Sequence, residues 1–136
     1  MVFSKNWKKT WELKSLTFDE LFNVIVKVII KQLDEIEEEE VKLESNLRVD
    51  FEVDSVDVVA MLLYLEDMFK KASQKTRTVV PTDKLGEVKL VEDIFDIIYE
   101  VILEIENKME PFEKIEPDFK ALEKQKKVGE LYTNNK

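Results

Sequence analysis

The sequence predicts an all-α fold, a bundle of three main helices and one short helix. Apolar residues repeat at helical spacing in three segments, 17–33, 55–71 and 90–106. Long connections separate these segments, and no pair of neighbouring strands is evident. Because each apolar stripe can be buried only against the other helices, the segments must pack together as a bundle.

The first helix is expected over residues 17–33. Thr17 is a candidate N-cap, and Glu20 follows three residues later as in a capping box. Several residues here are β-branched, which also suits a strand, but the length and the spacing of three and four favour a helix. Its apolar stripe consists of Phe18, Leu21, Phe22, Ile25, Val28, Ile29 and Leu33.

Residues 34–54 are expected to form a long connection. We interpret the run Glu37–Glu40 as a solvated surface rather than a metal site. Apolar and polar residues then alternate from Leu47 to Val53. This pattern fits a strand, or a loop that places alternate side chains on the core, and the loop is preferred because no second strand is evident.

The second helix is expected over residues 55–71, with Asp54 and Ser55 as candidate caps. A loop is predicted over residues 72–80. Pro81-Thr82 then opens a very short helix that Gly86 ends as a C′ residue. The apolar stripe of the second helix consists of Val58, Leu62, Leu65 and Phe69, extended by Val59 and Met68.

The last main helix is expected over residues 90–106, and a peripheral helix over 119–128. These expectations divide the chain into three regions. They are an N-terminal extension (1–16) with helical character, a helical domain (17–106), and a C-terminal extension (107–136), partly helical or disordered. The buried face of the last main helix consists of Val91, Ile94, Phe95, Ile98, Val101, Ile102 and Ile105.

The composition excludes most enzyme designs. The chain has no histidine, no cysteine and two glycines, so it has no imidazole triad, thiolate metal site or glycine-rich phosphate loop. We therefore expect neither an enzyme nor a metal protein. No segment reaches the roughly 18 apolar residues that span a bilayer, and no secretory signal is recognisable, which favours the cytoplasm.

The net charge of −9 is unevenly distributed. Residues 1–16 carry +3 (four Lys, one Glu) and residues 107–136 carry +1 (seven Lys, six acids), which leaves −13 on residues 17–106. Such a field repels nucleic acid and favours partners with basic surfaces. By itself, acidity is more often a matter of solubility.

The segment Asp54-Ser55-Val56-Asp57 stands where a loop becomes a helix. A serine there exposes its hydroxyl, and the helix N-terminus favours a phosphodiester on it. Asp54 and Asp57 cannot activate the serine without an imidazole, so they are better understood as handles for a modifying enzyme. The same four residues are also common as an ordinary helix cap. The surrounding sequence therefore has to decide between a structural and a functional role.

That context resembles the acyl carrier protein family over residues 18–106. The family has a long first helix, a long loop, an Asp-Ser-Leu-Asp motif that opens the second helix, a short third helix and a final helix. The corresponding segments are Asp54-Ser55-Val56-Asp57, Leu65-Glu66-Asp67-Met68-Phe69, Val80-Pro81-Thr82-Asp83 and Leu90-Val91-Glu92-Asp93-Ile94.

The resemblance implies a function. Ser55 would receive 4'-phosphopantetheine from coenzyme A through a holo-carrier synthase, with Asp54 and Asp57 recognised by that enzyme. The arm would carry acyl groups as thioesters in fatty acid, lipid or related biosynthesis, and the carrier, a monomer, would do no bond chemistry. Acyl-transfer or condensing enzymes with basic surfaces would contact Val56, Glu66 and Asp67.

The chain departs from the family at several positions. Glu52-Val53 stands where Gly-Ala or Gly-Tyr is usual, Val56 replaces leucine, and Val58 and Ala60 replace polar or acidic residues of the second helix. These departures indicate a specialised carrier. The alternatives are an aminoacyl carrier of the peptidyl or D-alanyl type, or an unmodified acidic adaptor protein.

Two tryptophans lie in the basic N-terminal extension. Trp7 and Trp11 are four residues apart and would share one face of a helix. They fit an anchor for a membrane surface or a partner, or a segment that docks onto the protein's own bundle. The second interpretation is preferred, because a single short helix binds bilayers weakly and the acidic domain is an obvious partner.

Overall fold

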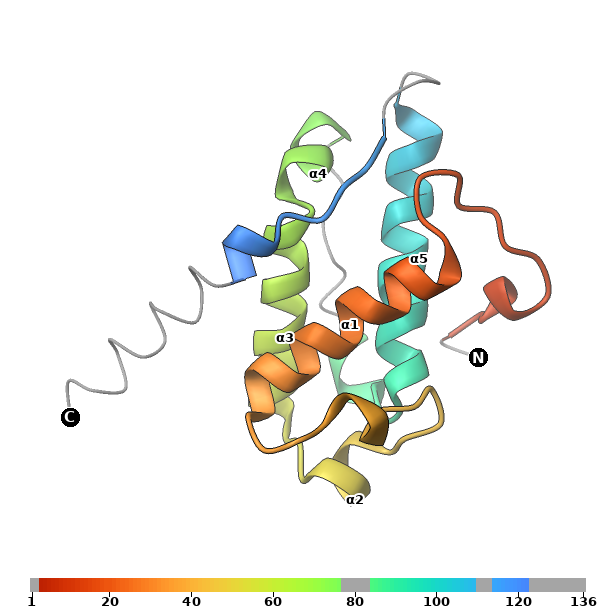
Figure 1. The fold of residues 1–136 in the computed structure, drawn as a ribbon. Coiled ribbons are helices and arrows are strands. Elements are labelled where there is room, and N and C mark those ends of the chain that lie inside the picture. Colours follow the sequence, from red (N-terminus) through yellow and green to blue (C-terminus); the bar gives the residue numbers. More distant parts are fainter. Residues whose placement is uncertain (1–2, 77–83, 110–113, 123–136) are drawn as a thin grey trace.

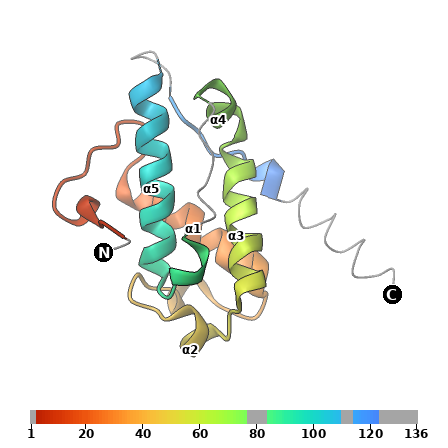
Figure 2. The ribbon, with the colours of Figure 1, turned by 180° about the vertical axis from the view of Figure 1, so that it is seen from behind.

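In the computed structural model, which describes residues 3–76, 84–109 and 114–122, three long helices form the bundle: α1 (Phe18–Leu33), α3 (Ser55–Met68) and α5 (Val91–Lys108). α3 and α5 run in the same direction and α1 crosses them (Figure 1), an arrangement that the view from behind also shows (Figure 2). α1 packs against both other helices. The all-α prediction is confirmed.

The predicted ends of α1 are close to those observed. Thr17 Oγ1 accepts a hydrogen bond from the backbone N–H of Glu20 at 3.2 Å, and the Glu20 carboxylate accepts one from the N–H of Thr17 at 2.9 Å. This reciprocal pair satisfies donors that the helix itself leaves free. The side chains of Leu21, Val24, Ile25, Val26, Val28 and Ile29 are buried.

α3 ends earlier than expected, at Met68, with Phe69 as its C-cap. The predicted stripe is buried along its whole length, including Val58 and Leu65. Val59 was expected to extend this stripe, but its side chain is 38 % exposed. It lies one residue beyond Val58, which on a helix is a rotation of about 100° away from the core.

Two segments expected to be loops are helical. Residues 47–51 form the short helix α2 (Leu47–Phe51), whose N-cap Asn46 accepts hydrogen bonds from the N–H groups of Arg48 and Val49. Of the alternating apolar residues, Leu47 is buried and Val49 is 75 % exposed. In the predicted loop over 72–80, residues 72–76 belong to α4 (Lys70–Thr76), and residues 77–80 lie outside the described residues. α4 packs against α3 and α5, so tertiary contacts support a sequence with no apolar periodicity of its own.

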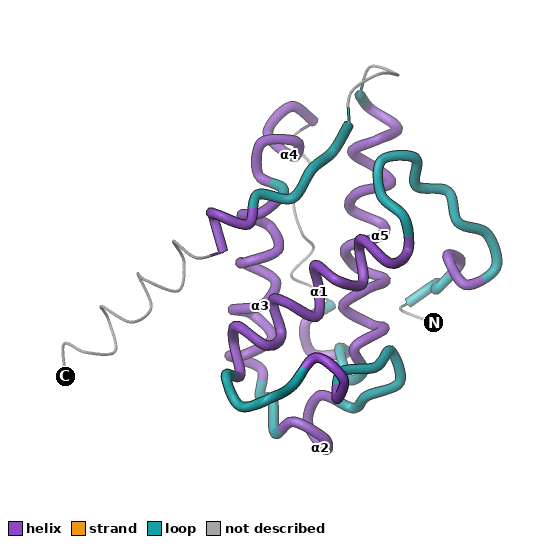
Figure 3. Tube along the Cα trace, viewed as in Figure 1, coloured by secondary structure: helices purple, strands orange, loops and turns teal. Residues whose placement is uncertain are grey.

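Short 3₁₀ turns complete the described parts: η1 (Asn6–Lys8), η2 (Glu38–Glu40) and η3 (Leu85–Glu87). The glutamates of η2 are exposed. Gly86 lies inside η3 and its φ is not positive, so it is not the left-handed residue that ends a helix. Pro81 and Thr82, expected to open that helix, lie outside the described residues. Across the described ranges there is no strand (Figure 3), only an isolated bridge between Asn46 and Leu90.

The N-terminal segment packs onto the bundle without forming the expected helix. Only the single turn η1 is present, yet Trp7 is 5 % exposed. The Trp7 ring lies 4.4 Å from that of Phe95, and the Trp11 ring 5.0 Å from that of Tyr99, measured between centroids. The two tryptophans therefore dock onto the protein's own helices. Figure 1 shows this segment in red beside α5.

The described part of the C-terminal segment, residues 114–122, also contacts the bundle. Ile115 is 1 % exposed and Leu122 5 %. The N–H of Asp118 donates to the carbonyl of Met68 at 2.9 Å, and residues 119–122 are helical; the rest of the helix expected over 119–128 lies outside the described residues. No helix in the described ranges is both long and apolar enough to cross a membrane.

Candidate functional site

Ser55 is the first residue of α3, and its side chain is exposed. Asp54 is the N-cap, with an extended backbone that turns the chain into the helix. Among the residues that the structure describes, no hydrogen bond to the Ser55 hydroxyl is formed. The hydroxyl is thus available to another molecule at the positive end of a helix dipole.

Asp54 and Asp57 make a reciprocal capping box around Ser55. Asp54 Oδ1 accepts from the N–H of Asp57 at 2.9 Å, and Asp57 Oδ2 accepts from the N–H of Asp54 at 3.2 Å. Asp57 Oδ1 also accepts from Gln32 Nε2 of α1 at 2.9 Å. Both oxygens of Asp57 are therefore engaged, whereas Asp54 keeps Oδ2 without a partner among the described residues.

A groove of about 700 Å³ lies beside Ser55. Its walls come from α2, from the start of α3 and from η3 with the residues that follow it. Two cationic residues, Arg48 and Lys89, and the apolar Val58 are among the residues that line it. The groove, which Ser55 also lines, thus offers apolar and cationic surface together with the carboxylates of Glu52 and Asp54.

Backbone contacts hold the walls of the groove together. The N–H of Leu47 donates to the carbonyl of Lys89 at 2.9 Å, and the N–H of Val53 donates to the carbonyl of Leu47 at 3.0 Å. Glu52 ends α2 in the left-handed region, with φ 57°. This left-handed residue turns the chain from α2 toward Asp54, so the sequence positions Ser55 at the rim of the groove.

Gly86 lines the same groove. A Cβ built there would meet no atom within 4 Å, and the backbone does not require glycine. The position is therefore open space on the groove wall, and a larger side chain would extend into unfilled volume rather than into the core.

The predicted partner-contacting residues lie on α3 with different exposures. Val56 is 72 % exposed, and Glu66 and Asp67 are half-buried near the other end of the helix. Val58 is buried, as its place in the predicted apolar stripe implies, although the resemblance matches it to a polar or acidic position of the second helix. It points into the bundle because it shares the spacing of Leu62 and Leu65.

Three exposed apolar residues near Ser55 were not predicted as site residues. Val59 and Leu63 are 38 % and 52 % exposed and form, with Val56, a stripe at i, i+3 and i+7 along α3. Val49 of α2, 75 % exposed, lies on the groove. For Val59 and Leu63 the signal was present in the sequence, since both fall between positions of the buried stripe of α3.

These features define a class of protein: a small helical bundle that presents a capped, exposed serine at the start of a helix beside a groove. The chain is 33 % identical over 78 residues to the acyl carrier protein of Phytoplasma mali, a match that covers 57 % of this chain and 83 % of that protein. It is 34 % identical over 73 residues to the acyl carrier protein of Coprothermobacter proteolyticus, with 54 % and 80 % covered.

The chain belongs to the acyl carrier protein family. No family model matches it, and no solved structure matches it. The matches cover little more than half of this chain.

Proposed function

We propose that this protein carries acyl groups as thioesters on a 4'-phosphopantetheine arm joined to Ser55. The observation that carries the proposal is the Ser55 hydroxyl, exposed at the first residue of α3 and without a partner among the described residues. The family membership supports it. The chain itself does no bond chemistry in this proposal, and the thiol that the arm supplies when attached forms the thioester.

The residues around Ser55 fit a phosphodiester. The N-terminus of α3 favours negative charge, and Arg48 and Lys89 line the adjoining groove. Val58 adds apolar surface that suits the uncharged part of an arm. The open position at Gly86 leaves the groove wall free of side-chain bulk.

Asp54 and Asp57 have different roles in this proposal. Asp57 holds the first turn of α3 and ties it to α1 through Gln32. Asp54 caps the helix with one oxygen and presents the other to the modifying enzyme. Asp54 is therefore the carboxylate that a basic residue or a metal ion of that enzyme would meet.

Partner enzymes would dock on the exposed face of α3. Val56, Val59 and Leu63 supply apolar contact, and Glu66 and Asp67 supply charge toward the end of the helix. Because residues 17–106 carry −13, partners with basic surfaces are favoured over acidic ones. Fatty acid, lipid or related biosynthesis is the setting proposed.

Intact mass spectrometry tests the covalent step. The purified full chain is incubated with coenzyme A and a phosphopantetheinyl transferase. A single adduct is expected in the natural sequence and in Ser4→Ala, which removes an exposed serine elsewhere, and none in Ser55→Ala. An adduct that persists in Ser55→Ala, or no adduct in any chain, contradicts the proposal.

A charge-matched pair tests the role of Asp54. Asp54→Asn keeps a good N-cap and removes the negative charge. Asp19→Asn makes the same change in the first turn of α1, where Asp19 is also exposed. Modification should slow in Asp54→Asn and keep its rate in Asp19→Asn; equal rates would assign no recognition role to Asp54.

A further inference from the structure

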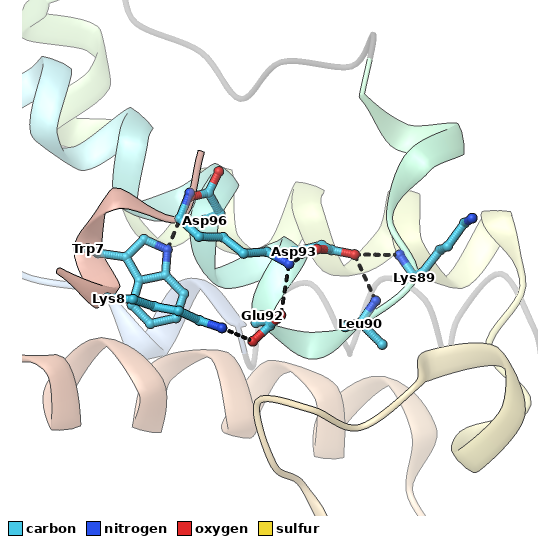
Figure 4. A network of polar contacts seen from close by, with 8 residues as sticks. Trp7, Lys8, Lys89, Leu90, Glu92, Asp93 and Asp96 are labelled. Carbon is cyan, nitrogen blue, oxygen red and sulfur yellow. Dashed lines mark hydrogen bonds and ion pairs between the residues drawn. The ribbon is translucent and has the colours of Figure 1, made fainter. Parts of the chain in front are cut away.

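Three acidic side chains are buried at the start of α5. Glu92 is 8 % exposed, Asp93 4 % and Asp96 1 %. Buried carboxylates need partners to offset the loss of hydration. Figure 4 shows that the partners come from the N-terminal segment and from the residues just before α5.

Lys5 joins two of these carboxylates. Its Nζ lies 2.8 Å from Glu92 Oε1 and 3.0 Å from Asp93 Oδ1. Its backbone N–H donates to Asp96 Oδ1 at 2.7 Å. Lys5 adopts φ 49°, in the left-handed region, which costs a non-glycine residue conformational energy, so the surrounding contacts hold it in place.

Lys8 forms an ion pair with only one of these three carboxylates, that of Glu92. Its Nζ lies 2.7 Å from Glu92 Oε2, and no ion pair between Lys8 and Asp93 is formed. The two lysines therefore share Glu92, and Lys5 is the cation that holds Asp93 among the described residues. This difference provides a matched control.

Asp93 connects the N-terminal segment to the wall of the Ser55 groove. While Oδ1 binds Lys5, Oδ2 accepts from the N–H groups of Lys89 and Leu90, each at 2.9 Å. The Lys89 carbonyl in turn accepts from the N–H of Leu47. Lys89 and Leu47 both line the groove, so a continuous series of polar contacts runs from Lys5 to the groove.

We propose that Lys5 is a positioning residue for the groove beside Ser55, acting through Asp93 on residues 89–90 and 47. The functional part of this inference rests on the proposed function of Ser55. Docking of the N-terminal segment thus fixes the groove wall, and its release loosens that wall. The N-terminal extension thereby regulates access to the serine that the arm would occupy.

The physical reason lies in what remains when Lys5 loses its charge. Glu92 keeps Lys8, but Asp93 Oδ1 is left without a cation at a site that is 4 % exposed. A buried unpaired carboxylate is strongly unfavourable. Asp93 relieves this by turning toward water, and its hydrogen bonds to the N–H groups of Lys89 and Leu90 are then broken.

Amide hydrogen exchange on the full chain without an arm measures the coupling. In Lys5→Gln, exchange at Lys89, Leu90 and Leu47 should rise by about tenfold, the size expected for losing a hydrogen bond to a charged group. Lys8→Gln should leave the exchange rates of these amides within about twofold of those in the natural sequence. Lys5→Arg should also keep the rates slow, because arginine retains the positive charge.

The amides in the buried middle of α1 serve as the global reference, because they are expected to exchange only when the whole chain unfolds. If Lys5 acted only on overall stability, they would speed up together with Lys89 and Leu90. Equal effects of Lys5→Gln and Lys8→Gln at residues 89–90, or a uniform change across the chain, would overturn the inference.

Transfer kinetics provide the functional readout. With a phosphopantetheinyl transferase, Lys5→Gln should raise the KM for the carrier several-fold relative to Lys8→Gln. An unchanged KM together with altered exchange would overturn the regulatory inference. If the natural sequence accepts no arm at all, the proposed function fails, and the exchange experiment still decides whether Lys5 positions the groove wall.

Discussion

The indole N–H of Trp7 donates to Oδ1 of Asp96 at 3.0 Å, inside the core of the protein. Asp96 is 1 % exposed, and its Oδ2 has no hydrogen-bond partner among the described residues. The N-terminal segment is thus bound to α5 by a polar contact as well as by aromatic packing.

Replacing Trp7 by Phe should lower the free energy of unfolding by about 1–3 kcal/mol. The change removes a hydrogen-bond donor from the buried carboxylate of Asp96, whose Oδ2 already has no donor among the described residues. Trp11→Phe is the matched control. The Trp11 indole donates to the carbonyl of Leu16 in a partly exposed setting, and its loss should cost less. Urea denaturation measures both, and equal losses would contradict the importance of the Asp96 contact.

Replacing Glu52 by Gly should stabilise the protein by about 0.5–1 kcal/mol. Glu52 has φ 57°, a conformation that glycine adopts without steric cost. Glu35→Gly is the control, since Glu35 is exposed and its φ is not positive; it should be neutral or destabilising. A thermal or urea unfolding series that shows Glu52→Gly less stable than the natural sequence would contradict the left-handed turn before Asp54.

Neighbouring leucines of α3 should respond in opposite ways to truncation. Leu62 is 4 % exposed and Leu63 52 %. Leu62→Ala should cost about 2–5 kcal/mol because it opens a cavity in the core, whereas Leu63→Ala should stay within about 0.5 kcal/mol. Chemical denaturation checks the pair, and similar costs would mean that α3 is rotated relative to the bundle.

The ion pairs of Glu92 should make stability depend on pH. Burial alone raises the pKa of the Glu92 carboxyl, but hydrogen bonds and charges from Lys5 and Lys8 outweigh it and hold that pKa below its usual value of 4.5. A lowered folded-state pKa gives stability that is fully present above the unfolded value and is lost as the pH falls through the folded one. Glu92→Gln should therefore be less stable than the natural sequence at neutral pH.

The difference in unfolding free energy between the natural sequence and Glu92→Gln should shrink as the pH drops below 4.5. Glu104→Gln is the control, since it loses only an exposed ion pair with Lys108 and should change stability by less than about 0.5 kcal/mol at either pH. Unfolding free energies measured across this range check the sign. A difference that stays constant or widens in acid would contradict a stabilising role for the ion pairs of Glu92.

The long helices could be predicted because local and tertiary signals agree in them. Thr17 with Glu20 marks the start of α1, and the observed helix begins at the next residue. Asp54 and Asp57 likewise mark the start of α3. In each case the cap and the apolar spacing independently indicate the same boundary.

The short helices could not be predicted because their signals conflict. The alternation from Leu47 to Val53 is typical of extended chain, and the cap that Asn46 provides for α2 is a finding of the structure. Lys70–Thr76 has no apolar face, and its helix depends on contacts with α3 and α5 that a linear pattern does not contain.

The candidate site likewise has one part that the sequence could predict and one part that it could not. The position of Ser55 at a helix start follows from local capping chemistry and was predicted. The groove was not, because it joins α2, α3 and η3 across distant parts of the chain. Nor could the contact of Lys5 with Asp93 be foreseen, since 88 positions of sequence separate two residues that only the folded chain brings together.

Fragmentation mass spectrometry of the protein purified from its own host tests the central claim most directly. The account predicts chains that bear a phosphopantetheine group, with or without an acyl cargo, localised by fragmentation to the peptide that contains Ser55. Native protein in which that peptide is always unmodified, or in which the group lies on another residue, would contradict it.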